Sequence, residues 1–184
     1  MNSNITNNIE HQCQEIKPTC AIYVADLADY NAGILRGLWI AIYGDSTVDE
    51  IEDQIQAMLS LKGHEEWEIH DYENLPENAQ DLDIEGIIKI AGLIETHGYE
   101  LTVAFLEHFD VDDIDRFDDY FIGVYQDLEG YAYEEVNACV DLEKALGSLA
   151  YYFNYEAYAR DLVMGGELYS ADIGPREVAL FRCY

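Results

Sequence analysis

The sequence predicts an α+β fold that is strand-rich at both ends and helical in the middle. β-forming residues cluster near the start and the end of the chain, whereas apolar residues between them recur at helical spacing. Hydrophobic residues make up 49% of the chain and aromatic residues 12%, enough to build a core despite the high charge. Changes of character near residues 76 and 118 divide the folded part into three segments: an α+β segment 20–76, a helical segment 77–118 and an α+β segment 119–184.

Residues 1–19 are polar and rich in Asn, and we expect them to form a mobile N-terminal extension. They contain neither an apolar run nor a basic start, so they predict neither a signal peptide nor a membrane span. The chain contains four cysteines, Cys13, Cys20, Cys139 and Cys183, and no two of them have the CxxC spacing. Without an export signal we expect reduced thiols and a cytoplasmic location.

The first folded segment is predicted to contain strands and one amphipathic helix. Strands are predicted at residues 20–27, 38–43 and 65–76. Asn31 and Gly33 lie between the first two strands and suit a long loop that doubles back. Thr47 and Glu50 have the spacing of a capping box, and apolar residues at helical spacing follow them.

The middle segment is predicted to hold three consecutive helices. They end at Gly98, at Phe109 and near residue 118. The third helix is capped by Asp110 and turns Val111, Ile114 and Phe117 inward. Its carboxylates must therefore face water.

The last segment alternates strands and helices. Strands are predicted at residues 120–126, 167–171 and 178–182, and helices at residues 128–140, 142–151 and 155–164. Asn154 suits the cap of the last of these helices, and Gly165 and Gly166 end it.

Motifs of the commonest enzyme classes are missing from the sequence. It contains no GxGxxG, Walker A, HExxH or GxSxG pattern. The stretch "DVDDIDRFDDYF", residues 110–121, is as rich in Asp as calcium loops are. However, Ile114 and Phe121 stand where an EF-hand needs an oxygen ligand and a glutamate. We therefore predict no catalytic residue, no metal site and no cofactor, and a hydrolase with a buried carboxyl pair has no support at the level of residues.

The net charge is the strongest functional signal. The chain carries 38 Asp plus Glu against 9 Lys plus Arg, a formal net charge of −29. A magnitude of about 2 to 8 suffices for the solubility of a small domain, so the excess indicates a further role. Duplex DNA carries one charge per about 1.7 Å of axis, so this charge corresponds to about 50 Å of duplex. Carboxylates at phosphate-like spacing would occupy a DNA-binding groove by the same electrostatics as the phosphates of DNA. Because nucleic acids and most membrane surfaces are themselves negatively charged, we expect neither of them to be a partner of this chain.

Three long stretches resemble the ArdA antirestriction family. They are "IYVADLADYNAGILRGLWI" (22–40), "EEWEIHDYENLP" (65–76) and "YFNYEAYARDLVMGGELYS" (152–170). They occur in the family's order, and the resemblance spans about residues 21–184. In the third stretch we expect Tyr155 and Tyr158 to be packing residues and Arg160 to pair with a nearby acid.

The resemblance implies an antirestriction protein that is not an enzyme. It would be an acidic DNA mimic that occupies the DNA-binding groove of type I restriction–modification enzymes and inhibits them by competition. The resemblance also implies an elongated chain of three small domains that forms a homodimer through residues 119–184. The carboxylates expected to replace phosphates are Asp110, Asp112, Asp113, Asp115, Asp118, Asp119, Asp127, Glu129, Glu134 and Glu135.

A second hypothesis stays open beside this one. The chain would then be an acidic adaptor whose carboxylates bind divalent cations or basic DNA-associated proteins. Calorimetry with calcium and magnesium distinguishes the two, because tight stoichiometric uptake favours the adaptor and weak, salt-screened binding favours the mimic.

Overall fold

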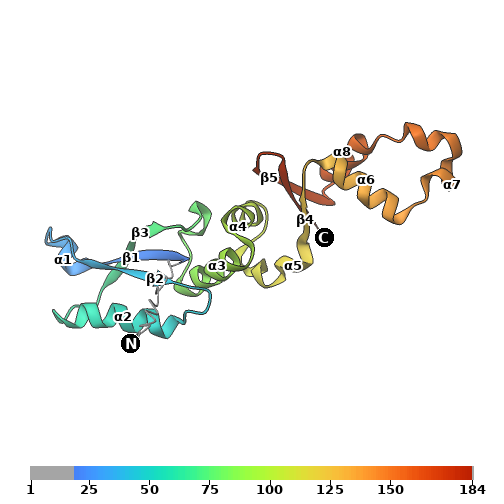
Figure 1. Cartoon of the computed structure of the whole chain (residues 1–184). Helices are drawn as coiled ribbons and strands as arrows, with labels where there is room; N and C mark the ends of the chain where they lie inside the picture. The colour runs from blue at the N-terminus through green and yellow to red at the C-terminus, as the bar shows by residue number, and fades with distance from the viewer. Residues whose placement is uncertain (1–18, 184) are drawn as a thin grey trace, which may run out of the picture.

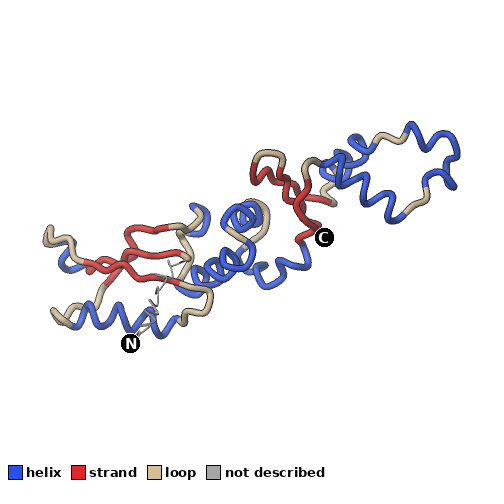
Figure 2. Tube along the Cα trace, viewed as in Figure 1, coloured by secondary structure: helices blue, strands red, loops and turns tan. Residues whose placement is uncertain are grey.

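The molecule is elongated, with two separate three-stranded sheets joined by helices (Figure 1). The computed structural model describes residues 19–183. The mobile extension predicted for residues 1–19 lies outside these residues, except for Thr19. Figure 2 shows the two sheets in red and helices between and beyond them, so the predicted α+β class is confirmed.

The first sheet is antiparallel and has the strand order β2-β1-β3. Its strands are β1 (Cys20–Asp26), β2 (Gly37–Ile42) and β3 (Trp67–Glu73), which confirms the three strands predicted here. Alternation places Ile22 and Val24 on the face that is buried in the core. Helix α2 (Val48–Ser60) packs there and begins at the predicted capping box, in which the Thr47 side chain accepts from the Glu50 amide at 3.3 Å.

The connection between β1 and β2 contains a short helix that the sequence did not predict. Helix α1 (Leu27–Asn31) begins where the side chain of Asp26 accepts from the amides of Ala28 and Asp29, at 3.1 and 3.2 Å. A helix of five residues is too short to show a helical period, and its cap falls inside the run that predicts the strand.

The middle segment contains two of the three predicted helices in regular form. Its elements are η1 (Glu77–Ala79), α3 (Ile84–His97), α4 (Tyr99–Leu106), η2 (Val111–Arg116) and α5 (Phe117–Tyr120). The single third helix that we predicted is wrong: a 3-10 helix, η2, precedes one α-helical turn, α5. Asp112, Asp113 and Asp115 lie inside this segment, and aspartate is a poor former of regular α-helix. Asp110 caps η2, as predicted, by accepting from the Asp112 amide at 3.3 Å. Ile114 and Phe117 are nevertheless buried, as predicted.

The last segment folds into the second sheet and a group of helices beyond it. Its elements are β4 (Phe121–Tyr125), α6 (Leu128–Cys139), α7 (Leu142–Leu146), η3 (Gly147–Tyr152), α8 (Tyr155–Met164), β5 (Leu168–Gly174) and β6 (Glu177–Arg182), with strand order β4-β6-β5. The continuous helix predicted over residues 142–151 is wrong. Gly147 has a φ of 59°, a conformation that favours glycine, and α7 ends before it at Leu146 while η3 begins at it.

One hydrophobic core extends from the first sheet through the middle helices into the second sheet. Phe105 on α4 is fully buried within it. The Phe105 ring centroid lies 5.1 Å from that of Phe117 and 5.9 Å from that of Phe181 on β6. The packing is therefore continuous across residue 118, and the division into three domains stays a prediction.

The first sheet meets α3 at a close approach between two glycines. The Gly44 amide donates to Glu95 Oε1 at 3.0 Å, and a Cβ atom on Gly44 would lie 2.6 Å from the Gly92 Cα atom. A Cβ atom on Gly92 would lie 3.6 Å from the Gly44 Cα atom, an ordinary contact. The junction therefore requires glycine at position 44 and accepts alanine at position 92.

Gly44→Ala is expected to lower the free energy of unfolding by about 1–3 kcal/mol, because the added methyl group forces α3 away from the sheet. Gly92→Ala is the matched control, and it should leave stability unchanged or raise it by about 0.5–1 kcal/mol, since alanine favours a helix interior. Urea denaturation measures both. Equal destabilisation by the two variants would contradict this description of the junction.

Candidate functional site

The acids expected to imitate phosphates fall into two groups along the chain. Eight are exposed, namely Asp110, Asp112, Asp115, Asp118, Asp119, Asp127, Glu129 and Glu134, while Asp113 and Glu135 are half-buried. One group consists of Asp110 and the acids of η2 and α5. The other consists of Asp127, which caps α6, and the acids of the first turns of α6. Strand β4 separates them, so the structure places them at the two ends of this strand (Figure 1).

The group on η2 and α5 is held by buried apolar side chains and partly neutralised by one arginine. Ile114 and Phe117 retain 8% and 2% of their exposure, which anchors this segment against α3 and α4. Arg116 lies 3.8 Å from Asp113 Oδ1 and 3.6 Å from Asp119 Oδ2. The remaining carboxylates project into solvent, so a compact acidic surface results.

The group on α6 combines a structural role with free carboxylates. Asp127 caps the helix by accepting from the Gly130 amide at 2.8 Å, whereas Glu129 and Glu134 are exposed. Burial raises the pKa of Tyr125, and the negative charges of Glu134 and Glu135 raise it further. Acidic side chains therefore gather along the first two turns of α6.

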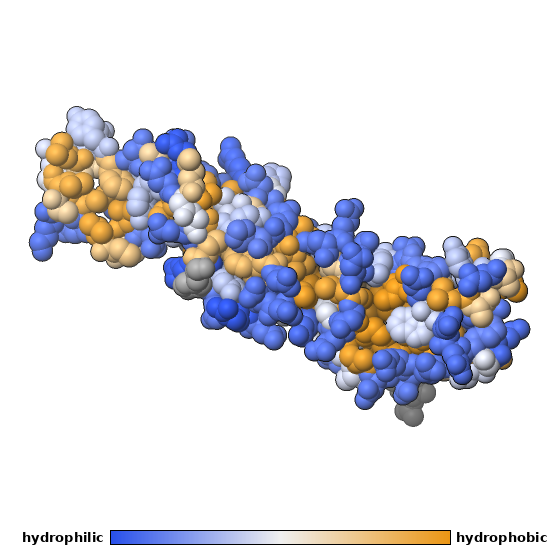
Figure 3. Space-filling model, turned by 180° about the vertical axis from the view of Figure 1, so that it is seen from behind, coloured by the Kyte–Doolittle hydropathy of each residue, from blue (hydrophilic) through white to orange (hydrophobic). Residues whose placement is uncertain are grey.

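Acids of the first segment were left out of the expected site. Residues 20–76, 77–118 and 119–184 carry twelve Asp plus Glu each, so acids occur in all three segments and are densest in the shortest one, residues 77–118. Asp45, Asp53, Glu66 and Glu73 are among the exposed acids of the first segment. Figure 3 shows hydrophilic residues along the whole length of the molecule. A count of acids per segment would have found this signal in the sequence.

In the third resembling stretch Tyr155 packs as expected, whereas Tyr158 is exposed and the arginine does not pair. Tyr155 is half-buried, and its ring centroid lies 5.2 Å from that of Tyr133 and 4.8 Å from that of Phe153. Tyr158 keeps 37% of its exposure and also lies against Phe153. The predicted pairing of Arg160 is wrong: this side chain is exposed and forms no ion pair with any residue between 19 and 183.

Comparison with known families decides the identity of the chain. The sequence profile described as antirestriction protein (ArdA) matches residues 22–177. The chain belongs to the ArdA antirestriction family. The match covers most of the chain, and proteins of this family are inhibitors rather than enzymes. No curated protein matches the chain.

In this ArdA-family chain, one cluster of potential metal ligands lies outside the acidic groups. Within residues 19–183 only Asp26, Asp29 and His64 place three such side chains together. His64 Nδ1 lies 2.7 Å from Asp26 Oδ2, and Arg36 donates to Asp29 Oδ2 at 3.2 Å. Each carboxylate therefore already has a cationic or donor partner, and the cluster ties α1 to the turn after α2. No helix in the same part of the chain is both long and apolar enough to span a membrane.

Asp26 should make the stability of this ArdA-family chain depend on acid pH. Burial raises the pKa of its carboxyl group, but hydrogen bonds from His64 and from the Asp29 and Ala28 amides lower it by more, so the pKa lies below 3.8. A lowered pKa contributes stability above the unfolded value, and this contribution is lost as pH falls through the folded value.

Asp26→Asn should therefore lower the urea midpoint at about pH 6, and the difference from wild type should shrink as the pH falls below about 4. Asp45→Asn, at an exposed turn position, is the control and should leave the midpoint nearly unchanged. A difference between Asp26→Asn and wild type that stays constant with pH would show that the negative charge of Asp26 is not what stabilises the fold.

Proposed function

We propose that this ArdA-family protein inhibits type I restriction–modification enzymes by imitating duplex DNA in their DNA-binding groove. The observation that carries the proposal is that exposed carboxylates occur in all three segments of an elongated molecule whose main hydrophobic core runs from the first sheet to the second. The fold thus presents negative charge along a length instead of at one point. Membership of an antirestriction family supports the same function.

The physical basis is competition for a positively charged surface. Proteins that bind DNA obtain much of their affinity from contacts between Lys or Arg and phosphates, together with release of counterions. Exposed carboxylates satisfy the same cations, and their mutual repulsion is relieved on binding. No catalytic residue or cofactor is needed for such inhibition. We place it in the cytoplasm, where these enzymes meet DNA, with the enzyme and not nucleic acid as the partner.

We also propose a homodimer formed at the end of the molecule that contains α6, α7 and η3. Figure 3 shows apolar surface at this end, which lies on the left of that view. Leu149 and Tyr151 keep 65% and 90% of their exposure. Isolated exposed apolar residues are common, but a group of them at one end indicates an interaction surface.

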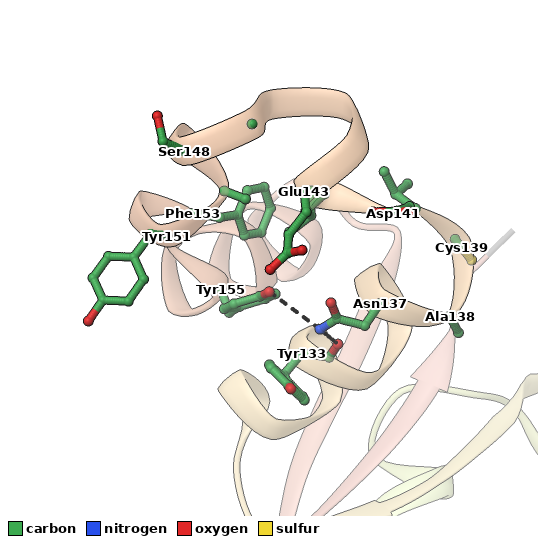
Figure 4. Close-up of a pocket in the computed structure, with 14 residues that line it drawn as sticks. Tyr133, Asn137, Ala138, Cys139, Asp141, Glu143, Ser148, Tyr151, Phe153 and Tyr155 are labelled. Carbon is green, nitrogen blue, oxygen red and sulfur yellow. Dashed lines mark hydrogen bonds between the residues drawn. The ribbon is translucent and has the colours of Figure 1, made fainter.

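The same end contains a broad concavity of about 1200 Å³. Asn137 and Tyr155 face each other across its base, with Asn137 Nδ2 3.3 Å from the Tyr155 hydroxyl oxygen (Figure 4). A second copy would cover these apolar and aromatic side chains, and it would double the length of the charged surface to about 100 Å of duplex equivalent. Sedimentation velocity tests the dimer: wild type should sediment as a dimer and Leu149→Ser/Tyr151→Ser as a monomer. A monomeric wild type at high micromolar concentration would refute it.

Displacement of labelled duplex DNA from a type I methyltransferase core tests the main proposal. Over a salt series, competition should weaken steeply as salt rises, because the affinity depends on many charge contacts. DNA that stays bound at a large excess of folded protein would exclude this enzyme as the target. Tight stoichiometric calcium uptake in calorimetry would favour the acidic adaptor instead.

A further inference from the structure

We propose that a groove beside β3 binds an arginine side chain presented by a basic segment of a protein partner. The groove has a volume of about 650 Å³ and lies between β3, α2 and the start of α3. It is separate from the acids of η2, α5 and α6. The proposal does not depend on DNA mimicry, because the argument uses only the chemistry of the groove.

The floor of the groove is apolar and aromatic. Trp67 and Ile69 pair with Asp26 and Val24 of β1, so both lie on the core-facing side of the sheet. Both are nevertheless only half-buried, as is Tyr72. The reason is that β3 is an edge strand, and α2 packs against β2 and α3. Apolar surface on the core side of β3 therefore remains open to a ligand.

The rim of the groove is acidic and comes from three elements. Exposed carboxylates are contributed by α2, by β3 and by the chain around the start of α3; they include Glu52, Glu68, Asp81 and Glu85. No Lys or Arg is among the residues that line the groove. Two of the rim acids lie near a basic side chain that does not line the groove: His70 is 3.6 Å from Glu68, and Lys89 is 3.7 Å from Glu85. Burial raises the pKa of Tyr72, and the negative charges of Asp81 and Glu68 raise it further.

Aromatic floor and acidic rim together fit a guanidinium group better than other ligands. A planar cation stacks on aromatic faces while its N–H groups donate to surrounding carboxylates, and its aliphatic stem covers apolar surface. The Tyr72 hydroxyl donates to the Gln80 carbonyl at 2.5 Å, so its oxygen remains available as an acceptor. Phosphates and carboxylates are repelled by the rim, and an ammonium group lacks the flat face.

The two tryptophans of the chain make the groove directly observable. Trp67 lies on the floor, whereas Trp39 pairs with Tyr23 on the opposite face of the same sheet. In Trp39→Phe protein, titration with an acetylated and amidated Gly-Arg-Gly-Arg-Gly peptide at moderate salt should change Trp67 fluorescence in a saturable manner. Trp67→Phe protein, which keeps Trp39, should show no saturable change. Absence of a saturable Trp67 signal would overturn the proposal.

Charge-matched variants separate the groove from general attraction between the peptide and an acidic protein. In the Trp39→Phe background, Glu52→Gln/Glu68→Gln/Asp81→Asn should raise the peptide Kd at least about tenfold, a loss of about 1.4 kcal/mol. Asp112→Asn/Asp115→Asn/Asp118→Asn removes the same charge far from the groove and should change Kd less than about twofold. Asp83 is left intact because it caps α3. Circular dichroism and urea midpoints verify that both variants fold.

Two results would refute the arginine site even if the peptide binds. Equal weakening by the two triple variants would show diffuse electrostatic attraction. Equal affinity for the corresponding lysine peptide would show that stacking on the floor does not contribute. Because neither titration uses a restriction–modification enzyme or DNA, failure here leaves the proposed function standing, and failure of DNA displacement leaves the groove standing.

Discussion

Neutralising five exposed carboxylates together is expected to weaken competition with DNA about 100-fold, whereas each single change should weaken it less than about fivefold. The five changes are Asp112→Asn, Asp115→Asn, Asp118→Asn, Glu129→Gln and Glu134→Gln. Each removes one exposed charge contact, and contacts at separate positions add approximately in free energy. The capping acids Asp110 and Asp127 are left intact, since their loss would also cost helix stability. The measurement is the concentration that displaces half of the labelled DNA from the methyltransferase core.

A matched set of five substitutions in residues 20–76 tests how much of the length of the molecule contacts the restriction–modification enzyme. It consists of Asp45→Asn, Asp53→Asn, Glu65→Gln, Glu66→Gln and Glu73→Gln, all at exposed positions. An equal loss would show that the enzyme contacts the whole length, and a small loss would assign recognition to the middle and C-terminal acids. If one single substitution abolished competition while the fold survived, a local hot spot would replace the distributed mimic.

Phe105→Ala is expected to lower the free energy of unfolding by about 3–5 kcal/mol, the largest effect on stability of any single change considered. The ring is fully buried and contacts Phe109, Phe117 and Phe181, so it joins α4 to the turn of α5 and to the second sheet. Its removal leaves a cavity at the place where the core crosses from the middle helices to the C-terminal strands. Urea denaturation measures the loss.

Phe153→Ala provides the control, because Phe153 is half-buried at the far end of the molecule and should cost less than about 2 kcal/mol. Small-angle X-ray scattering of folded Phe105→Ala protein adds a second measurement, since a weakened junction should broaden the distribution of molecular lengths. If the two variants lost the same free energy of unfolding, the aromatic cluster around Phe105 would not be what joins the middle helices to the second sheet.

Local signals in the sequence predicted most of the regular elements. Thr47 with Glu50 and Asn154 mark helix starts, and the structure shows both caps in place. Six strands were predicted in the right positions, with ends that differ by a few residues. These predictions succeed because capping, alternation and helical spacing depend on residues that are close in the chain.

Predictions that depend on the balance between local and distant contacts were less complete. The aspartates of η2 and Gly147 interrupt helices whose apolar spacing is helical, so periodicity alone joins what the backbone separates. The Asp26–His64 pair links residues 38 positions apart, and no local pattern indicates it. The site prediction likewise named acids in the middle and C-terminal segments and left out the first segment, which carries as many acids as either of them.

The sequence by itself determined that this protein exposes many carboxylates, because so many charges have too few cations to pair with in a core. It also determined the apolar spacing that turns those charges outward. Only the tertiary structure decided where the charges lie. Phe105 joins segments into one core over long sequence separations, and the groove brings Glu52, Glu68 and Asp81 around Trp67 from three elements. Such neighbours are set by packing among distant residues, which composition and periodicity do not encode.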